Sequence, residues 1–219
     1  MSNIKEMKIY SLEGIAKDVR IAIDRNGASA ALKDLGDVDT LTIDEIIMSK
    51  VVEAVKRVHS IAPAHLLDGG YFFGDSIHWP DENPGCGWVS LPDDFMRFIS
   101  FKMDDWARGV FTCMSTDDVE YEKQSLPFKG VRGTPLSPKC FISIRPEGRI
   151  MEFYSSKNNS AKVSFANYLP YPKIENNSVR ICEKCYDGVV YTIAGLVMAT
   201  VGDVDKSNVF NELAKSALV

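Results

Sequence analysis

The segment Trp88–Arg108, WVSLPDDFMRFISFKMDDWAR, constrains the fold most, because a turn signal and a strand pattern meet within it. Pro92 followed by two aspartates predicts one turn of helix. Proline suits the first helical position because the N–H that it lacks would be unpaired there, and carboxylates are stabilised at the positive N-terminal end of a helix. Beyond that turn the side chains alternate, which predicts a strand. Its core face would carry Phe95, Ile99, Phe101 and Met103, with Arg97 as the single cation among them. A helical interpretation through Phe95 and Trp106 stays open.

The chain has 219 residues, of which 45% are hydrophobic, so it can bury a substantial core. Its formal net charge of −5 argues against a dedicated duplex DNA binder, because such proteins present a basic surface to the phosphates. No basic stretch followed by an apolar run opens the sequence, which predicts that the chain is cytoplasmic at synthesis. Five cysteines, an odd number spread over a long chain, predict reduced thiols.

The first 66 residues carry two helical patterns. Apolar residues recur at three- and four-residue intervals from Lys8 to Ile23, which predicts an amphipathic helix. A second stripe runs from Ile47 to Val58, behind Thr42 and Glu45, whose spacing is that of a capping box. We expect two antiparallel helices joined by a short link.

The last 40 residues return to helical signals. Tyr186–Thr200 carries few charges and predicts a buried helix, although its valines and threonines would also suit a strand. Gly202 and Asp203 then predict a helix end and a new N-cap. The final helix would place on one face Phe210, Leu213, Ala214 and Ala217.

Between these ends the sequence changes to short β-rich runs, at residues 95–103, 109–114, 140–144, 150–154 and 162–168. Residues 66–88 predict a long ordered loop or an irregular hairpin, and residues 123–138 predict an extended loop with little core of its own. The expected fold is therefore α+β in one domain. In it, residues 1–66 and 179–219 form an antiparallel helical bundle, and residues 67–178 form a loop-rich insertion with a small central antiparallel β-sheet.

The search for chemistry finds two weak patterns. Cys182 and Cys185 have the spacing of half a zinc site, but no second close pair completes it. Acidic residues and one histidine gather in the loop, namely Asp68, Asp75, His78, Asp81 and Glu82, without the spacing of a calcium loop. The sequence thus predicts no catalytic residue, no metal and no cofactor.

A family resemblance rests on residues 91–104, LPDDFMRFISFKMD. They resemble the P-x-D-F-x-R signature, followed by a strand, of the adaptor or tubular-tail proteins beneath the portal of short-tailed phages. Segments from Leu136 to Pro170 look like the family's sheet portion. The closing YDGVVYTIAGLVMATVGDVDKSNVFNELAKSAL looks like its C-terminal helix pair. The phenylalanine- and asparagine-rich style is most similar to the ring proteins of crAss-like phages.

The resemblance implies a virion structural protein, not an enzyme, assembled in the host cytoplasm and located in the head–tail connector. Copies, twelve by the family's match to the portal, would pack head-to-tail into a closed homo-oligomeric ring. The ring would bridge the portal protein and other tail or ring proteins. It would line the channel through which genome DNA passes without sequence-specific binding and without contact with a membrane.

Within the signature, Pro92, Asp94, Phe95 and Arg97 are predicted to form a structural clamp. A cation on an apolar face needs a partner, since an unpaired buried charge costs several kcal/mol. Asp93 or Asp94, or a carboxylate on a neighbouring helix, would supply it. The resulting pair would lock the sheet to the helical body.

Two other classes of function stay open. A small metal-dependent hydrolase would use Asp75, His78 and Asp81 within the loop 68–82, because carboxylates and imidazole can bind a divalent ion or transfer protons. A host-side binding module of unknown ligand is the third possibility.

Overall fold

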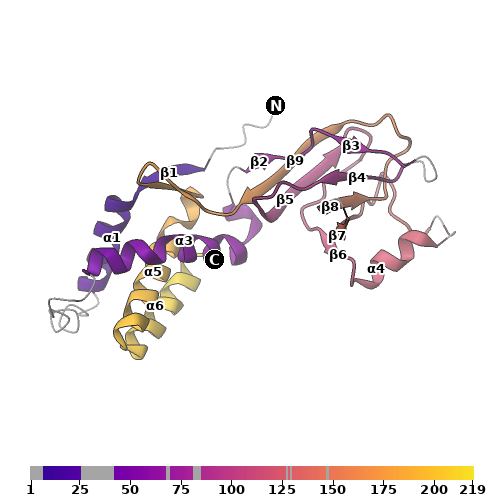
Figure 1. Cartoon of the computed structure of the whole chain (residues 1–219). Coiled ribbons are helices and arrows are strands. Elements are labelled where there is room, and N and C mark those ends of the chain that lie inside the picture. Colours follow the sequence, from indigo (N-terminus) through magenta and orange to yellow (C-terminus); the bar gives the residue numbers. More distant parts are fainter. Residues whose placement is uncertain are drawn as a thin grey trace. The chain divides into compact units, whose positions relative to one another are not determined.

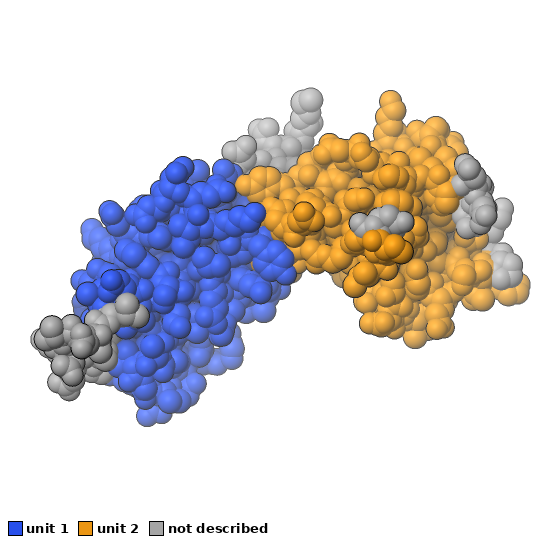
Figure 2. Space-filling view, viewed as in Figure 1, with its two compact units in different colours: residues 1–69, 171–219 blue, residues 70–170 orange. Residues whose placement is uncertain are grey.

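The computed structural model describes residues 7–25, 42–67, 70–80, 85–126, 128, 130–146 and 148–219 (Figure 1). The chain divides into two compact units, which Figure 2 shows in different colours. The helical unit comprises Met1–Gly69 and Tyr171–Val219, and the sheet unit comprises Gly70–Pro170. The sheet unit is therefore inserted in the sequence between the two halves of the helical unit.

Four helices of the helical unit follow the predicted patterns: α1 (Leu12–Arg25), α3 (Ile43–Ile61), α5 (Tyr186–Val201) and α6 (Val204–Ser216). The capping box of α3 is confirmed, because Thr42 Oγ1 accepts from the Glu45 N–H and the Glu45 carboxylate accepts from the Thr42 N–H at 2.7 Å. The helical interpretation of α5 is confirmed over the strand. Gly202, with φ at 87°, ends it in the left-handed conformation.

The N-terminal helix begins later than predicted. Lys8–Ser11 forms strand β1, which pairs antiparallel with β11 (Ser178–Ile181), and β10 (Ile174–Glu175) completes this three-stranded sheet. Ser11 Oγ then accepts from the Gly14 N–H at 3.2 Å, which satisfies a donor in the first turn of α1. Within the described ranges, no helix combines the length and the hydrophobicity needed to cross a bilayer.

The first sheet of the sheet unit has the order β2–β9–β5, formed by β2 (Tyr71–Phe72), β9 (Val163–Pro170) and β5 (Phe95–Met103). The strand interpretation of β5 is thus confirmed over the helix. Register shifts between Phe95 and Arg97 and between Phe98 and Ser100 break the simple alternation. Phe98 therefore packs against the core cluster of this unit at a position where alternation predicted Ile99.

The second sheet has the order β3–β4–β8–β7–β6: β3 (Ile77–His78), β4 (Gly87–Ser90), β8 (Gly148–Phe153), β7 (Cys140–Arg145) and β6 (Met114–Ser115). All neighbours pair antiparallel except β6 and β7, which are parallel. The short helices α4 (Val119–Glu122) and η2 (Lys123–Ser125) follow β6. Aromatic rings dominate the core, with Phe101 in contact with Phe73, Trp106 and Phe153.

The predicted helical bundle with a small central sheet is wrong. The described residues contain eleven strands in three sheets beside five α-helices, so that the α+β protein is rich in sheet. Strands of two residues, such as β2, β3, β6 and β10, are too short to produce a period-two signal. Strands β2 and β3 lie in the stretch that predicted a loop or irregular hairpin, and β4 begins there, because the glycines and prolines of the stretch masked the strand signal.

Candidate functional site

A buried carboxylate organises one face of the five-stranded sheet. Glu152, near the end of β8, is only 3% exposed. Its Oε1 accepts from Ser143 Oγ at 2.7 Å and from Arg145 Nη2 at 3.0 Å. Its Oε2 accepts from the hydroxyls of Tyr154 at 2.5 Å and Tyr121 at 3.2 Å. Four side chains from β7, from α4 and from just after β8 thus meet on one acid.

These hydrogen bonds determine the charge of the site. Burial by itself raises the pKa of Glu152, but the hydrogen bonds from Tyr154, Ser143 and Arg145 outweigh it, so the pKa lies below its ordinary value of 4.5. Burial and the neighbouring carboxylate raise the pKa of Tyr154. A general base works best with a pKa near the working pH. The pKa of Glu152 is lowered, away from neutral pH, which favours a structural role for this carboxylate.

Replacing Tyr154 with phenylalanine is expected to raise the pKa of Glu152, because the variant lacks the shortest of the hydrogen bonds to the carboxylate. The stability that Glu152 contributes is present above its ordinary pKa of 4.5 and is lost as pH falls through the depressed folded value. NMR titration of the Glu152 carboxyl carbon measures the pKa in each protein. Tyr168→Phe, which removes a hydroxyl bound to Asp94, is the control and should leave Glu152 unchanged. An unshifted titration in the Tyr154 variant would contradict the assignment.

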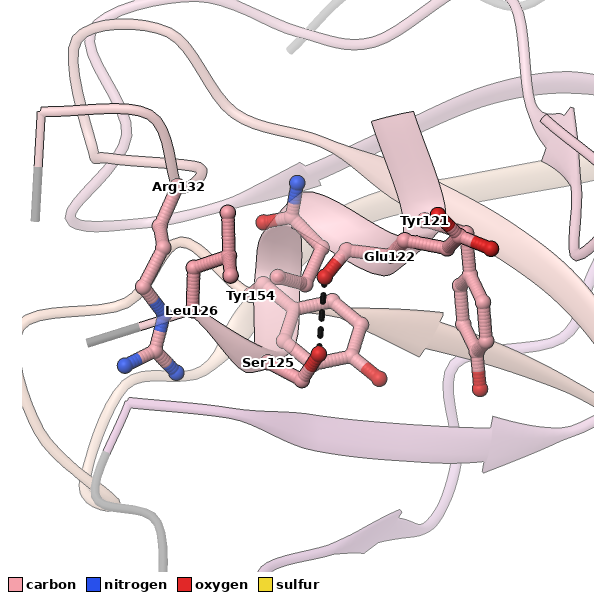
Figure 3. A pocket seen from close by; sticks show the side chains of 7 residues that line it. Tyr121, Glu122, Ser125, Leu126, Arg132 and Tyr154 are labelled. Atoms are coloured by element: carbon pink, nitrogen blue, oxygen red, sulfur yellow. Dashed lines mark hydrogen bonds between the residues drawn. The ribbon is translucent and has the colours of Figure 1, made fainter. Parts of the chain in front are cut away.

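A cavity of about 650 Å³ lies beside this network (Figure 3). Arg132 lies at one end of it and Tyr121 at the other, with the ring of Tyr154 between them. Gln124, 1% exposed, fixes the wall, since its Nε2 donates to the Glu120 carbonyl and its Oε1 accepts from the Gly133 N–H, both at 2.8 Å. The cavity is therefore built on a rigid frame.

Arg132 is the cation of this cavity. Its Nη2 donates to the Cys86 thiol at 3.7 Å, and among the described residues no carboxylate forms an ion pair with it. Burial raises the pKa of Cys86, which the arginine partly offsets. A guanidinium beside aromatic rings suits a carboxylate or an aromatic side chain of a partner.

The segment around this cavity exposes apolar side chains. We define the apolar arm as residues 119–138, which run from α4 to the start of β7. Five of its large hydrophobic side chains are 41–76% exposed: Val119, Leu126, Phe128, Val131 and Leu136. Large apolar side chains exposed at several positions of one segment make that segment a candidate for contact with another protein.

The predicted clamp residues lie in one turn and the strand start that follows. The Phe95 N–H donates to the Pro92 carbonyl at 3.0 Å, so Pro92 begins a hydrogen-bonded turn where one turn of helix was predicted. Asp94 accepts from the Tyr168 hydroxyl at 2.8 Å, and the rings of Phe95 and Tyr168 stack at 5.5 Å. Arg149 Nη2 donates to the Phe95 carbonyl at 2.8 Å. Sequence reasoning missed Tyr168 and Arg149, since both lie more than 50 residues away.

Arg97 is half-buried and lies opposite Leu169 in the β5–β9 pairing. The register shift just before it removes the reason for assigning it to the apolar face. The carboxylate partner proposed for Arg97, and its role in locking sheet to helices, stay predictions.

The acidic loop does not assemble a metal site in the described part of the chain. Asp68, Asp81 and Glu82 lie outside the described residues, Asp75 is exposed, and the His78 ring stacks on Trp88 at 3.9 Å. No group of three or more His, Cys, Asp or Glu side chains that could hold an ion occurs among the described residues.

The Cys182–Cys185 pair lies at the turn before α5. The Cys182 N–H donates to His59 Nε2 at 3.2 Å, and the Cys185 thiol donates to the Leu66 carbonyl at 3.6 Å. Both cysteines are buried, and no disulfide joins them. These contacts join α3 and the start of α5 within the helical unit.

Sequence logic could have found Glu152, because it is the one charge in the run Ile150–Tyr154 and a buried acid needs donors. Nothing in the sequence pointed to Tyr121, Gln124 or Arg132, which the arm brings to the sheet. The chain matches no protein-family model, and no curated protein matches it. The resemblance to phage ring proteins therefore stays a prediction.

Proposed function

We propose that this protein is a virion structural protein that forms a ring in the head–tail connector of a short-tailed phage, beneath the portal. The observation that carries the proposal is the apolar arm, with five large hydrophobic side chains that are 41–76% exposed along 18 residues. The signature at residues 91–104 supplies the family.

The arm is suited to bind a neighbouring subunit. Exposed apolar side chains gain free energy when a partner covers them, at about 25 cal/mol per Å² of buried apolar surface. The Gln124 hydrogen bonds and the contacts of Glu120 with Lys123 and Lys139 fix the base of the arm before binding. Pre-organisation of this kind lowers the entropy that association costs. A head-to-tail contact that repeats around an axis closes into a ring.

The net charge of −5 fits a channel wall. Acidic side chains facing the lumen would repel DNA phosphates within about one Debye length, about 8 Å at physiological salt. Genome DNA would then pass without adhering. The protein would carry out this function by geometry and charge, with no reaction step.

Electron microscopy of the protein mixed with its neighbouring portal protein tests the proposal. We expect the isolated protein to be monomeric or weakly associated and to form closed annuli, of twelve copies, on the portal. A dispersed mass profile by analytical ultracentrifugation with portal present would overturn the ring assignment.

The double variant Phe128→Ser with Leu136→Ser tests the arm itself. Both side chains are exposed, at 69% and 76%, so the fold should persist while ring formation falls at least about tenfold. Ile144→Ser is the matched control, since Ile144 is 83% exposed in the same unit but outside the arm. Normal rings in the arm variant would remove the arm from the interface.

A further inference from the structure

Two cysteines, Cys113 and Cys140, lie beside the β6–β7 pairing at the base of the apolar arm. Strands β6 and β7 pair parallel, with Met114 opposite Phe141 and Ser115 opposite Ile142. Cys113 and Cys140 each precede the first of these partners by one residue, so the parallel register places them face to face. Neighbouring strands lie about 4.8 Å apart, within the span of about 4.4 to 6.8 Å between the Cα atoms of a disulfide.

The two thiols also share surroundings. Cys140 is fully buried in the core cluster of the sheet unit, and Cys113 packs against that cluster from the edge of the sheet. Both are free thiols. A negative charge on Cys113 raises the pKa of Cys140, which agrees with their proximity.

We propose that Cys113 and Cys140 are a modification site, at which the folded protein forms a disulfide on meeting a low-molecular-weight disulfide. The bond would join the two ends of the segment that carries the apolar arm. It would enclose the 26 residues from Met114 to Lys139. The crosslink itself does not depend on the proposed ring function.

The reaction is thiol–disulfide exchange in two steps. The Cys113 thiolate attacks one sulfur of the reagent, forming a mixed disulfide and releasing one thiol. The Cys140 thiolate then attacks the Cys113 sulfur and releases the second thiol. The two cysteines are oxidised and lose one hydrogen each, and the reagent is reduced to two thiols.

Burial controls the rate of this exchange. Burial raises the pKa of Cys113 to about 12 and raises that of Cys140 as well, so thiolate is scarce in the closed state. Strand β6 has only two residues and forms the edge of its sheet, which makes it a segment that opens locally at low free energy. Exchange would therefore pass through the opening of β6 and be slow.

The test incubates the full chain with oxidised glutathione under native conditions, followed by acid quench, alkylation and mass spectrometry of a non-reducing digest. We expect a peptide linked through Cys113 and Cys140, about 2 Da lighter than its reduced parts. The linked protein should melt roughly 5–10 °C higher, because the bond removes loop entropy from the unfolded chain. Reduction should reverse the shift.

Cys113→Ser should abolish both the linked peptide and the melting shift, whereas Cys86→Ser should leave both unchanged. If Cys140→Ala folds poorly, the result with Cys113→Ser still decides the question, because Cys113 is only partly buried. Glutathione adducts on Cys113 without a link to Cys140 would overturn the proposal. So would a linked peptide from Cys182 and Cys185 alone, or a Cys113–Cys140 link that forms only in denaturant.

Discussion

Replacing Glu152 with alanine is expected to lower the free energy of unfolding by about 3 kcal/mol, near the lower end of the range of about 3–5 kcal/mol for breaking a buried ion pair. The variant leaves Ser143 and Tyr154 without their acceptor and Arg145 without its carboxylate. We expect a loss near the lower end of this range because the Arg145 side chain is 41% exposed, so water can hydrate its guanidinium once the carboxylate is gone. Urea unfolding measures the loss.

Glu212→Ala is the matched control for this prediction. Glu212 also pairs with a cation, Lys215, but its side chain is 72% exposed, so its loss should change stability by less than about 0.5 kcal/mol. Glu152→Gln should fall between the two, because the amide keeps the shape and one acceptor oxygen. If the alanine variant were as stable as the control, Glu152 would not organise this face of the sheet.

Replacing Phe101 with alanine is expected to cost about 3–5 kcal/mol, as for other buried aromatic residues. Phe101 is fully buried, and its ring contacts Phe73, Trp106 and Phe153 at centroid distances of 5.5–5.9 Å. Its backbone also bridges to Val110 in both directions, at 2.9 and 2.8 Å. The variant leaves a cavity at the centre of the aromatic core.

Tryptophan fluorescence reports the unfolding of the sheet unit only, because this unit contains all three tryptophans, Trp79, Trp88 and Trp106. The two units can unfold separately, so a probe confined to one of them is needed. Phe111→Ala, at a position 62% exposed, should shift the midpoint only slightly. Equal midpoints for the two alanine variants would show that the aromatic core is not centred on Phe101.

The elements that sequence reasoning located best are those whose signals are local. The Thr42–Glu45 capping box and the Gly202–Asp203 break involve residues within four positions of one another, and the structure has both as predicted. The same locality explains the success with strand β5 and with the hairpin partners β7 and β8. Helix and strand periods are properties of short windows.

The candidate site lay beyond such reasoning. Glu152 meets Tyr121 because α4 returns over the sheet, a contact between residues 31 positions apart. Arg149 reaches Phe95 over 54 positions, and Tyr168 reaches Asp94 over 74. No local pattern encodes these distances, since they depend on which strands pair.

By itself, the sequence determined the helices, the principal strands and the requirement that a lone charge in an apolar strand find partners. Only the tertiary structure decided which partners those are. In the Trp88–Arg108 segment, Phe95, Phe101 and Met103 are buried as the alternation predicted, but the register shifts of β5 bring Phe98 against the core where Ile99 was expected. Strand pairing decides which way a side chain points because each backbone N–H and C=O of a buried strand must form a hydrogen bond. Where the two strands do not match residue for residue, a bulge restores the hydrogen bonding.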